Sequence, residues 1–146
     1  MYGDKRNSNL KIRNFKNNLF FKEYVEYKNI EKELNKMDIL LMPYSKQIPS
    51  GGNVGDITKF TSPLKLFDYL TTGKTIISTD LPILREILTD NNSIFVKNFN
   101  NPYSWKMEMN KIINNIEKRK ILSLNNLKLS KKYNLRKRAS RFLEGL

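Results

Sequence analysis

Lys65 and Asp68 lie three residues apart, just after Ser62 and Pro63, two residue types that commonly begin a helix. Serine caps a helix start, and proline suits its first turn because the missing N–H would be unpaired there. The first backbone N–H groups, near Leu64 and Lys65, carry partial positive charge and can hold a phosphate, to which Lys65 adds a full charge. Asp68, about one turn further on, can accept hydrogen bonds from two sugar hydroxyls. The spacing therefore suits a nucleoside diphosphate.

A simpler alternative stays open for the same residues. Lys65 and Asp68 can form a solvated i, i+3 pair that only stabilises the helix, by a few tenths of a kcal/mol. The helix itself is well specified, because Leu66 and Leu70 share one face, the two charges share the opposite face, and Gly73 suits the position after the helix end.

Residue types that are missing restrict the chemistry. The chain has no cysteine and no histidine. Disulfides, thiolate nucleophiles, Ser-His-Asp catalysis and most zinc sites are therefore excluded. Carboxylates, lysines, hydroxyls and backbone amides remain. No carboxylate cluster demands a metal, and no cofactor is expected.

The formal net charge of +13 is concentrated in the last third of the chain. Residues 101–146 carry 12 basic and 3 acidic side chains, whereas residues 38–100 carry equal numbers of each. This excess indicates contact with an anionic partner, a nucleic acid or a lipid surface, or else a general bias toward its 20 lysines and 19 asparagines. No aromatic ladder or nucleic-acid motif accompanies the charge, so no nucleic acid is expected. An anionic membrane surface would be met by Lys118, Arg119, Lys120, Lys131, Lys132, Arg136 and Arg138.

The hydrophobic pattern predicts short apolar strands that alternate with helices. Strands are expected at residues 1–3, 19–25, 38–43, 75–78 and 93–96, and helices at 29–37, 63–72, 81–88 and in at least two segments after 102, the last near 135–146. This order predicts a doubly wound α/β sheet in a single domain over residues 1–146. Such sheets bind ligands beyond the carboxyl ends of their strands, where the long loop 44–61 lies. Because no apolar run could cross a bilayer and no secretory signal is seen, a cytoplasmic protein is expected.

The run SPLKLFDYLTTGKTIISTDLPILREIL, residues 62–88, resembles the donor-binding segment of family 4 glycosyltransferases, retaining enzymes of the GT-B fold. Members often read S-P-x-K-x-x-E-Y-x-x-x-G-K-P-I-I-x-T-D-L-P-x-x-R-E. The residues that match are Ser62, Pro63, Lys65, Tyr69, Gly73, Lys74, Ile76, Ile77, Thr79, Asp80, Leu81, Pro82, Arg85 and Glu86. The flanking segments LFFKEYV, NIEKELNKMDILLMPYS and YNLRKRASRFLEGL are also similar, so the resemblance covers about residues 15–146.

The resemblance implies roles for particular residues. Asp68 takes the place of a glutamate that contacts the ribose hydroxyls of a nucleotide-sugar donor. The helix start would bind the diphosphate through Ser62, Pro63, Leu64 and Lys65. The nucleotide and the transferred sugar would lie near the preceding loop, at Tyr44, Ser45, Gly51 and Gly52.

The sequence also departs from the family pattern. The first of two paired glutamates would fall at Phe60, and the second is the shorter Asp68. A GT-B enzyme has two α/β domains, and the resemblance implies that this chain is the carboxyl-terminal one, which we expect to be truncated at its amino end. The acceptor, a glycan or lipid-linked molecule, would then need a missing amino-terminal domain or a split-enzyme partner, so the catalytic residues stay unknown and the fragment alone is expected to be inactive. The alternative is a non-catalytic nucleotide-binding or interaction module, or a relic fragment.

Three further residue assignments follow from the sequence. Asp80 is expected to cap the helix that begins near Pro82. Arg85 and Glu86 are expected to form a solvated or packing pair. Trp105 is expected to pack a helix rather than to stack on a ligand.

Overall fold

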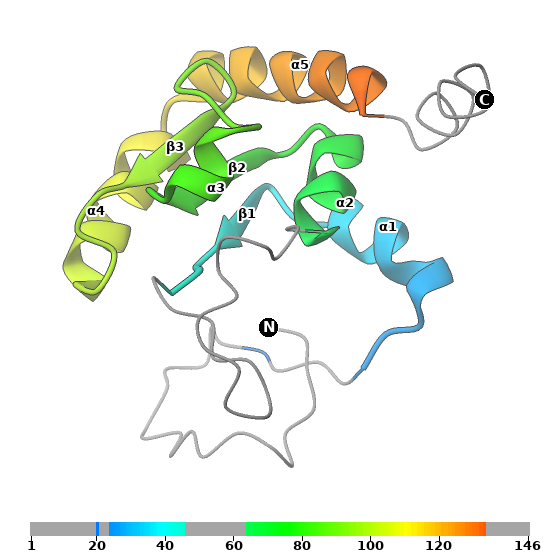
Figure 1. Cartoon of the computed structure of the whole chain (residues 1–146), viewed down its shortest axis with the longest axis horizontal. Coiled ribbons are helices and arrows are strands. Elements are labelled where there is room, and N and C mark those ends of the chain that lie inside the picture. The colour runs from blue at the N-terminus through cyan, green and yellow to red at the C-terminus, as the bar shows by residue number, and fades with distance from the viewer. Residues whose placement is uncertain (1–19, 21–23, 46–63, 134–146) are drawn as a thin grey trace, which may run out of the picture.

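The computed structural model describes residue 20 and residues 24–45 and 64–133. The elements in this part of the chain, coloured along the sequence in Figure 1, are α1 (Tyr27–Asn35), β1 (Ile39–Met42), α2 (Leu64–Thr72), β2 (Thr75–Thr79), α3 (Pro82–Arg85), β3 (Ser93–Val96), α4 (Pro102–Ile113) and α5 (Ile116–Lys132). They confirm the strands predicted at 38–43, 75–78 and 93–96 and the helices predicted at 29–37, 63–72 and 81–88.

Other predictions fall wholly or partly outside this range. The strand end at 1–3, most of the loop 44–61 and the last helix near 135–146 lie outside the described residues. The strand expected at 19–25 is not confirmed, because its described residues Phe20, Tyr24 and Val25 belong to no strand.

The three strands form a parallel sheet in the order β1-β2-β3. Leu40 pairs with Ile76, which in turn pairs with Ser93. The central strand β2 is buried along its whole length, because it has a neighbour on each side and helices on each face. Its small polar residues Thr75, Ser78 and Thr79 are therefore buried together with Ile76 and Ile77.

Helices cover both faces of the sheet, as a doubly wound fold requires. Successive residues of β2 point to opposite faces, so Ile76 joins one core cluster and Ile77 the other. The first cluster packs beneath α2 and α3, with the fully buried Leu66, Leu70 and Leu84. The second packs beneath α4 and α5, with the buried side chains Val96, Ile112 and Leu122 and the half-buried Trp105. The Trp105 Nε1 donates to the Phe99 carbonyl oxygen at 2.8 Å, which confirms a packing role.

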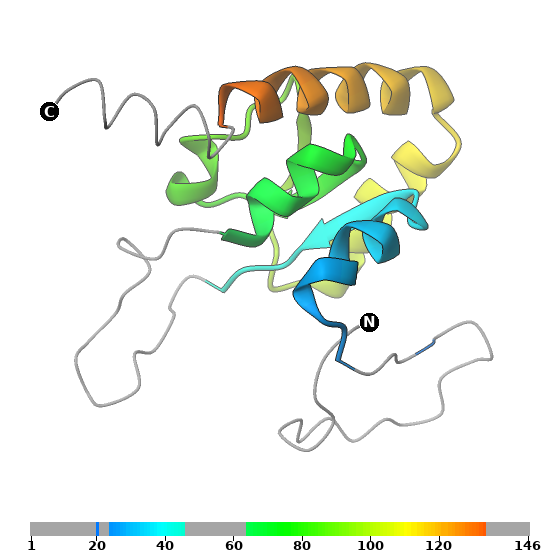
Figure 2. The same ribbon diagram turned by 90° about the vertical axis from the view of Figure 1, so that its right-hand side faces the viewer.

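Helix α5 lies across the amino ends of the strands. The side-chain amide of Asn126 donates to the carbonyl oxygen of Lys74, just before β2, at 2.9 Å. The amide of Asn125 donates to the carbonyl oxygen of Asn91, just before β3, at 2.6 Å. Figures 1 and 2 show α5 along this side of the domain. The opposite edge, where the strands end, carries the segments that leave the strands.

Candidate functional site

The carboxyl ends of the three strands, at Met42, Thr79 and Val96, define one edge of the domain, which we call the carboxyl edge. Helix α2 runs antiparallel to the strands, since it connects two parallel neighbours, so its amino end also lies there. Leu64, the first residue of α2, is 72% exposed, and Lys65 is exposed beside it. Two predicted site residues, Leu64 and Lys65, are therefore presented to solvent at this edge.

Four other predicted residues cannot be placed. Ser62 and Pro63, which would complete the helix start, lie outside the described residues, as do Gly51 and Gly52. The end of α2 is as predicted: Gly73 follows Thr72 with a positive φ of 63°. A Cβ atom at this glycine would lie 2.6 Å from the Cγ of Leu127, so α5 also requires a bare backbone here.

Asp68 takes a hydrogen bond from a residue that the sequence did not single out. The hydroxyl of Tyr27, the first residue of α1, donates to Asp68 Oδ1 at 3.2 Å. The negative charge of Asp68, together with this hydrogen bond, raises the pKa of Tyr27 above its ordinary value. The contact joins the start of α1 to the middle of α2 across 41 positions of sequence.

The solvated pair that the sequence left open is not formed. None of the ion pairs in the described part of the chain joins Lys65 to Asp68. The Lys65 side chain is exposed, whereas Asp68 faces Tyr27 on α1. The two charges therefore do not neutralise each other.

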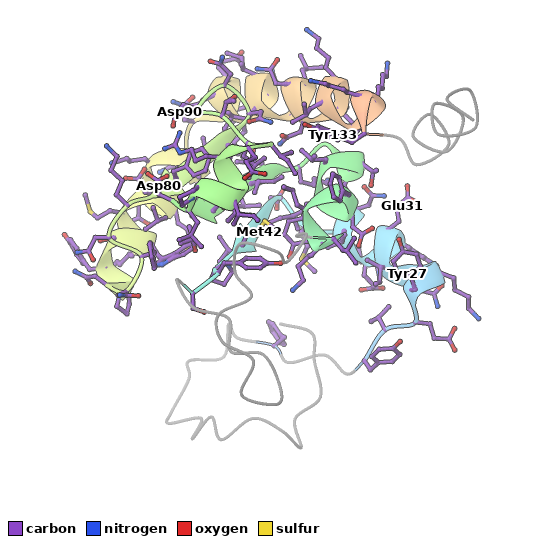
Figure 3. All side chains as sticks on the ribbon, in the orientation of Figure 1. Tyr27, Glu31, Met42, Asp80, Asp90 and Tyr133 are labelled. Carbon is purple, nitrogen blue, oxygen red and sulfur yellow. The ribbon has the colours of Figure 1, made fainter. Side chains whose placement is uncertain are left out.

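A groove of about 570 Å³ lies between α1, α2 and the end of α5. Figure 3 labels three residues on its border, Tyr27 and Glu31 on α1 and Tyr133 after α5. Phe67 and Tyr133 pack with ring centroids 5.6 Å apart at one side of the groove. Its lining has apolar members, Ile30, Leu34, Phe67 and Leu70, and polar members, Lys28, Glu31, Asp68, Thr71, Ser130 and Lys131. The groove combines an apolar floor with a carboxylate acceptor.

Tyr44 and Ser45 begin the loop that leaves β1, and a buried threonine holds its start. The backbone N–H of Tyr44 donates to Thr79 Oγ1 at 2.9 Å. The Thr79 hydroxyl lies within 3.0 Å of the Tyr44 carbonyl oxygen and 3.3 Å of that of Met42. Thr79 is fully buried at the end of β2. Sequence reasoning noted Thr79 only as a match to the family pattern and gave it no role.

Tyr69 joins the same neighbourhood from α2. Its hydroxyl donates to the Leu41 carbonyl oxygen at a long 3.4 Å. Burial raises the pKa of Tyr69, and the nearby Tyr44 and Asp68 raise it further. Burial also raises the pKa of Tyr44. Both phenols therefore stay neutral at physiological pH.

Asp80 does not cap the following helix, contrary to the prediction. The residue before α3 is Leu81, whose side chain makes no cap hydrogen bond. Asp80 instead accepts two hydrogen bonds from Arg85, from Nε at 2.7 Å and from the guanidinium nitrogen Nη2 at 3.1 Å. These bonds hold the pKa of Asp80 below its usual range. The prediction rested on the short polar side chain of Asp80, which is of a type that often caps helices. The guanidinium of Arg85, five residues away, is a stronger partner because it donates two hydrogen bonds to the carboxylate.

The expected Arg85–Glu86 pair is also wrong. The acidic partners of Arg85 are Asp80 and Asp90, the latter accepting from Nη1 at 2.9 Å. The guanidinium lies over the ring of Phe95, 3.5 Å from its centroid. Arg85 thereby ties the turn after β2 to the turn before β3.

The carboxyl edge therefore gathers three groups from separate parts of the sequence. The start of α2 brings Leu64, Lys65 and Asp68, and the exit of β1 brings Tyr44 and Ser45. The exit of β2 brings Thr79 and Asp80. In the described ranges, no three acidic side chains converge closely enough to hold a metal ion. Within the same ranges, no helix is long and apolar enough to span a bilayer.

Comparison with known proteins gives one family. No curated protein sequence matches the chain. The family described as Glycosyl transferases group 1 matches residues 3–129, a range that includes every element from α1 to α4 and most of α5. The match is to the wider family and does not single out family 4 within it. A parallel sheet with helices on both faces and a match over most of the sequence agree, and the chain belongs to the group 1 glycosyl transferases, as the carboxyl-terminal α/β half of a GT-B fold.

Proposed function

We propose that this domain binds the nucleotide-sugar donor of a retaining glycosyltransferase that passes a hexose-type sugar to a glycan or lipid-linked acceptor. Asp68 would accept the hydrogen bonds of the ribose hydroxyls. The start of α2, from Ser62 to Lys65, would hold the diphosphate. Tyr44, Ser45, Gly51 and Gly52 would surround the nucleotide and the sugar.

The position of Asp68 carries this proposal. Its carboxylate already accepts a hydroxyl hydrogen bond, from Tyr27 at 3.2 Å, so the site holds an acceptor where a sugar hydroxyl can replace a phenol. A carboxylate has lone pairs for about four donors, which leaves room for a ribose diol. The apolar floor of the neighbouring groove suits the flat face of a base or ribose.

Lys65 and the first turn of α2 supply the positive charge that a diphosphate needs. The helix has nine residues, its first described turn contains no acidic side chain, and its amino end is exposed at the carboxyl edge. Aligned peptide dipoles and unpaired N–H groups favour an anion at that position. The departing diphosphate would gain most from these groups as its charge develops.

We assign the acceptor to a second α/β domain, on another chain or elsewhere in a longer one. Transfer with retention needs the acceptor and the leaving diphosphate on the same face of the sugar, and this domain would supply one wall of such a cleft. The 146-residue chain by itself is therefore expected to bind a donor without transferring its sugar.

The direct test is a calorimetric or NMR titration of the chain with UDP, GDP and their sugars. We expect saturable binding. Asp68→Asn should weaken it by about tenfold, because one or two hydrogen bonds to a charged acceptor are lost. Glu117→Gln is the matched control, because it removes an exposed carboxylate from α5, on the opposite edge. Equal affinities of the two variants would contradict the assignment of Asp68. A folded wild-type chain without nucleotide affinity would favour the non-catalytic interaction module.

A further inference from the structure

Helix α5 presents apolar side chains on two opposite faces. Its inner face buries Leu122 and Asn126, which are 2% and 0% exposed. Its outer face carries Ile121 and Leu124, which are 58% and 57% exposed. Most surface helices have only one apolar stripe, which faces the core. The second stripe of α5 serves no purpose within the described part of the domain.

Lysines surround this outer stripe. Lys120, Lys128 and Lys131 follow Glu117 at helical spacing, so they lie on the same face as Ile121 and Leu124. Every residue of this outer face is exposed, and we define the face as Glu117, Lys120, Ile121, Leu124, Lys128, Lys131 and Lys132.

Most of the positive charge on this face is uncompensated locally. Glu117 pairs with Lys120 at 3.2 Å. No ion pair among the described residues includes Lys128, Lys131 or Lys132. The carboxyl end of α5 therefore carries three unmatched ammonium groups within one turn and a half.

The combination of charge and apolar groups restricts the partner. A second copy of the chain would place lysine against lysine, at a net charge of +13 each. A nucleic acid would attract the lysines, but aliphatic side chains gain nothing from a phosphate backbone, and stacking on bases requires aromatic rings. A bilayer with anionic headgroups uses both features, because lysines attract the headgroups and aliphatic side chains enter the interface.

We propose that the outer face of α5 binds the surface of a bilayer that contains anionic lipids. The helix would lie parallel to the membrane plane, with Ile121 and Leu124 between the headgroups. The exposed side chain of Ile116, 56% accessible at the start of α5, would extend the contact.

The placement of α5 separates the apolar part of its outer face from the candidate donor site. Asn125 and Asn126 fix the helix to the amino ends of the strands, whereas Asp68 belongs to the carboxyl edge. A domain held by α5 would keep its candidate site open to the solution. Lys131 also lines the groove beside Asp68, whereas Ile121 and Leu124 do not. Loss of vesicle binding in the Ile121→Gln, Leu124→Gln variant can therefore be separated from an effect on nucleotide binding.

The test is co-sedimentation of the full chain with phosphatidylcholine vesicles, with and without an equal amount of phosphatidylglycerol. We expect binding only to the anionic vesicles and a marked loss at high salt. Ile121→Gln with Leu124→Gln, and separately Lys128, Lys131 and Lys132 all changed to Gln, should each weaken it by about tenfold or more. These side chains are exposed, so the variants should retain the thermal unfolding transition of the wild type.

Two control variants match these changes in kind. Tyr103→Gln removes an apolar side chain that is 62% exposed on α4. Lys28, Lys32 and Lys36 all changed to Gln remove the same charge from α1 and the residue that follows it. Unchanged vesicle binding in both controls supports the proposal. Absence of binding to anionic vesicles, equal losses in test and control variants, or binding to RNA alone that needs the lysines but not Ile121 and Leu124 would overturn it.

Discussion

The Thr79 hydroxyl at the end of β2 accepts a hydrogen bond from the backbone N–H of Tyr44 at 2.9 Å. This bond fixes the first residues of the loop that leaves β1. Pro43 follows the last residue of β1 and has no N–H to donate to a neighbouring strand. The next N–H, that of Tyr44, is shared between Thr79 Oγ1 and the Met42 carbonyl oxygen at 3.1 Å. The loop residues proposed to surround the donor therefore depend on a buried side chain of the neighbouring strand.

Replacement of Thr79 tests this dependence. Thr79→Val keeps the shape but removes the buried hydroxyl that accepts from the Tyr44 N–H and donates to a neighbouring carbonyl oxygen, so the free energy of unfolding should fall by about 1–3 kcal/mol. Thr79→Ser keeps the hydroxyl and should recover most of the hydrogen-bond contribution. Urea unfolding of the three proteins measures the difference. If the valine and serine variants were equally unstable, lost methyl packing rather than the hydrogen bond would be responsible.

The Tyr27–Asp68 contact predicts an effect on ligand affinity. Tyr27 is 71% exposed, so Tyr27→Phe should change the free energy of unfolding by less than about 0.5 kcal/mol. It also removes a competitor for Asp68 Oδ1. Nucleotide affinity should therefore rise about two- to fivefold, which corresponds to the energy of one weak hydrogen bond. Calorimetry with UDP and GDP checks this result. A loss of affinity would mean that the phenol itself contacts the nucleotide.

The same contact can be followed without any ligand. Because Asp68 raises the pKa of Tyr27, Asp68→Asn should lower it toward its ordinary value. Spectrophotometric titration of the phenols between neutral and strongly alkaline pH measures the shift. Tyr27→Phe identifies which step belongs to this residue. An identical titration curve in wild type and Asp68→Asn would show that the two side chains are not in contact.

The Asp80–Arg85 pair predicts a pH-dependent stability. Arg85 lowers the pKa of Asp80 in the folded chain. At a pH near the ordinary pKa of an aspartate, the unfolded chain therefore binds more protons than the folded chain. The stabilisation is complete above the unfolded pKa, about 3.9, and is lost as the pH falls through the lower folded pKa. Asp80→Asn should therefore cost about 1 kcal/mol at neutral pH and much less at strongly acidic pH.

Urea unfolding at several pH values measures this difference. Asp90→Asn is the matched control, because the Asp90 side chain is 78% exposed and contacts Arg85 through one nitrogen. It should cost no more than about 0.5 kcal/mol at any pH. A cost of Asp80→Asn that does not depend on pH would contradict an ionic origin.

Gly73 is predicted to tolerate no side chain. Gly73→Ala meets two penalties, a positive φ of 63° and a Cβ placed 2.6 Å from Leu127 Cγ, and should destabilise the chain by about 2 kcal/mol or more. The same substitution in a Leu127→Ala background should cost less, because only the backbone term remains. Thermal unfolding of the double-mutant cycle separates the two terms. Full additivity would show that α5 does not pack on the glycine.

Local pattern was sufficient for the elements around the site. The apolar run at residues 38–43 predicted a parallel strand, and β1 forms there and pairs parallel with β2. The spacing of Leu66 and Leu70 predicted the buried face of α2, and Gly73 predicted its end. These signals lie within a few residues of the structure they specify, so they can be read before any tertiary contact is known.

The sequence by itself determined the fold class, the position of α2 and the charges that it carries, because backbone preferences and hydrophobic periodicity act locally. Only the tertiary structure decided which side chains meet: Tyr27 with Asp68 across 41 positions, Thr79 with Tyr44 across 35, and Arg85 with Asp80 in place of a cap. The first two contacts form because the parallel strands and the helices between them bring distant segments together. Arg85 binds Asp80 because it can donate two hydrogen bonds to that carboxylate. The same holds for α5, whose apolar outer stripe became visible only when its other face was seen to be buried.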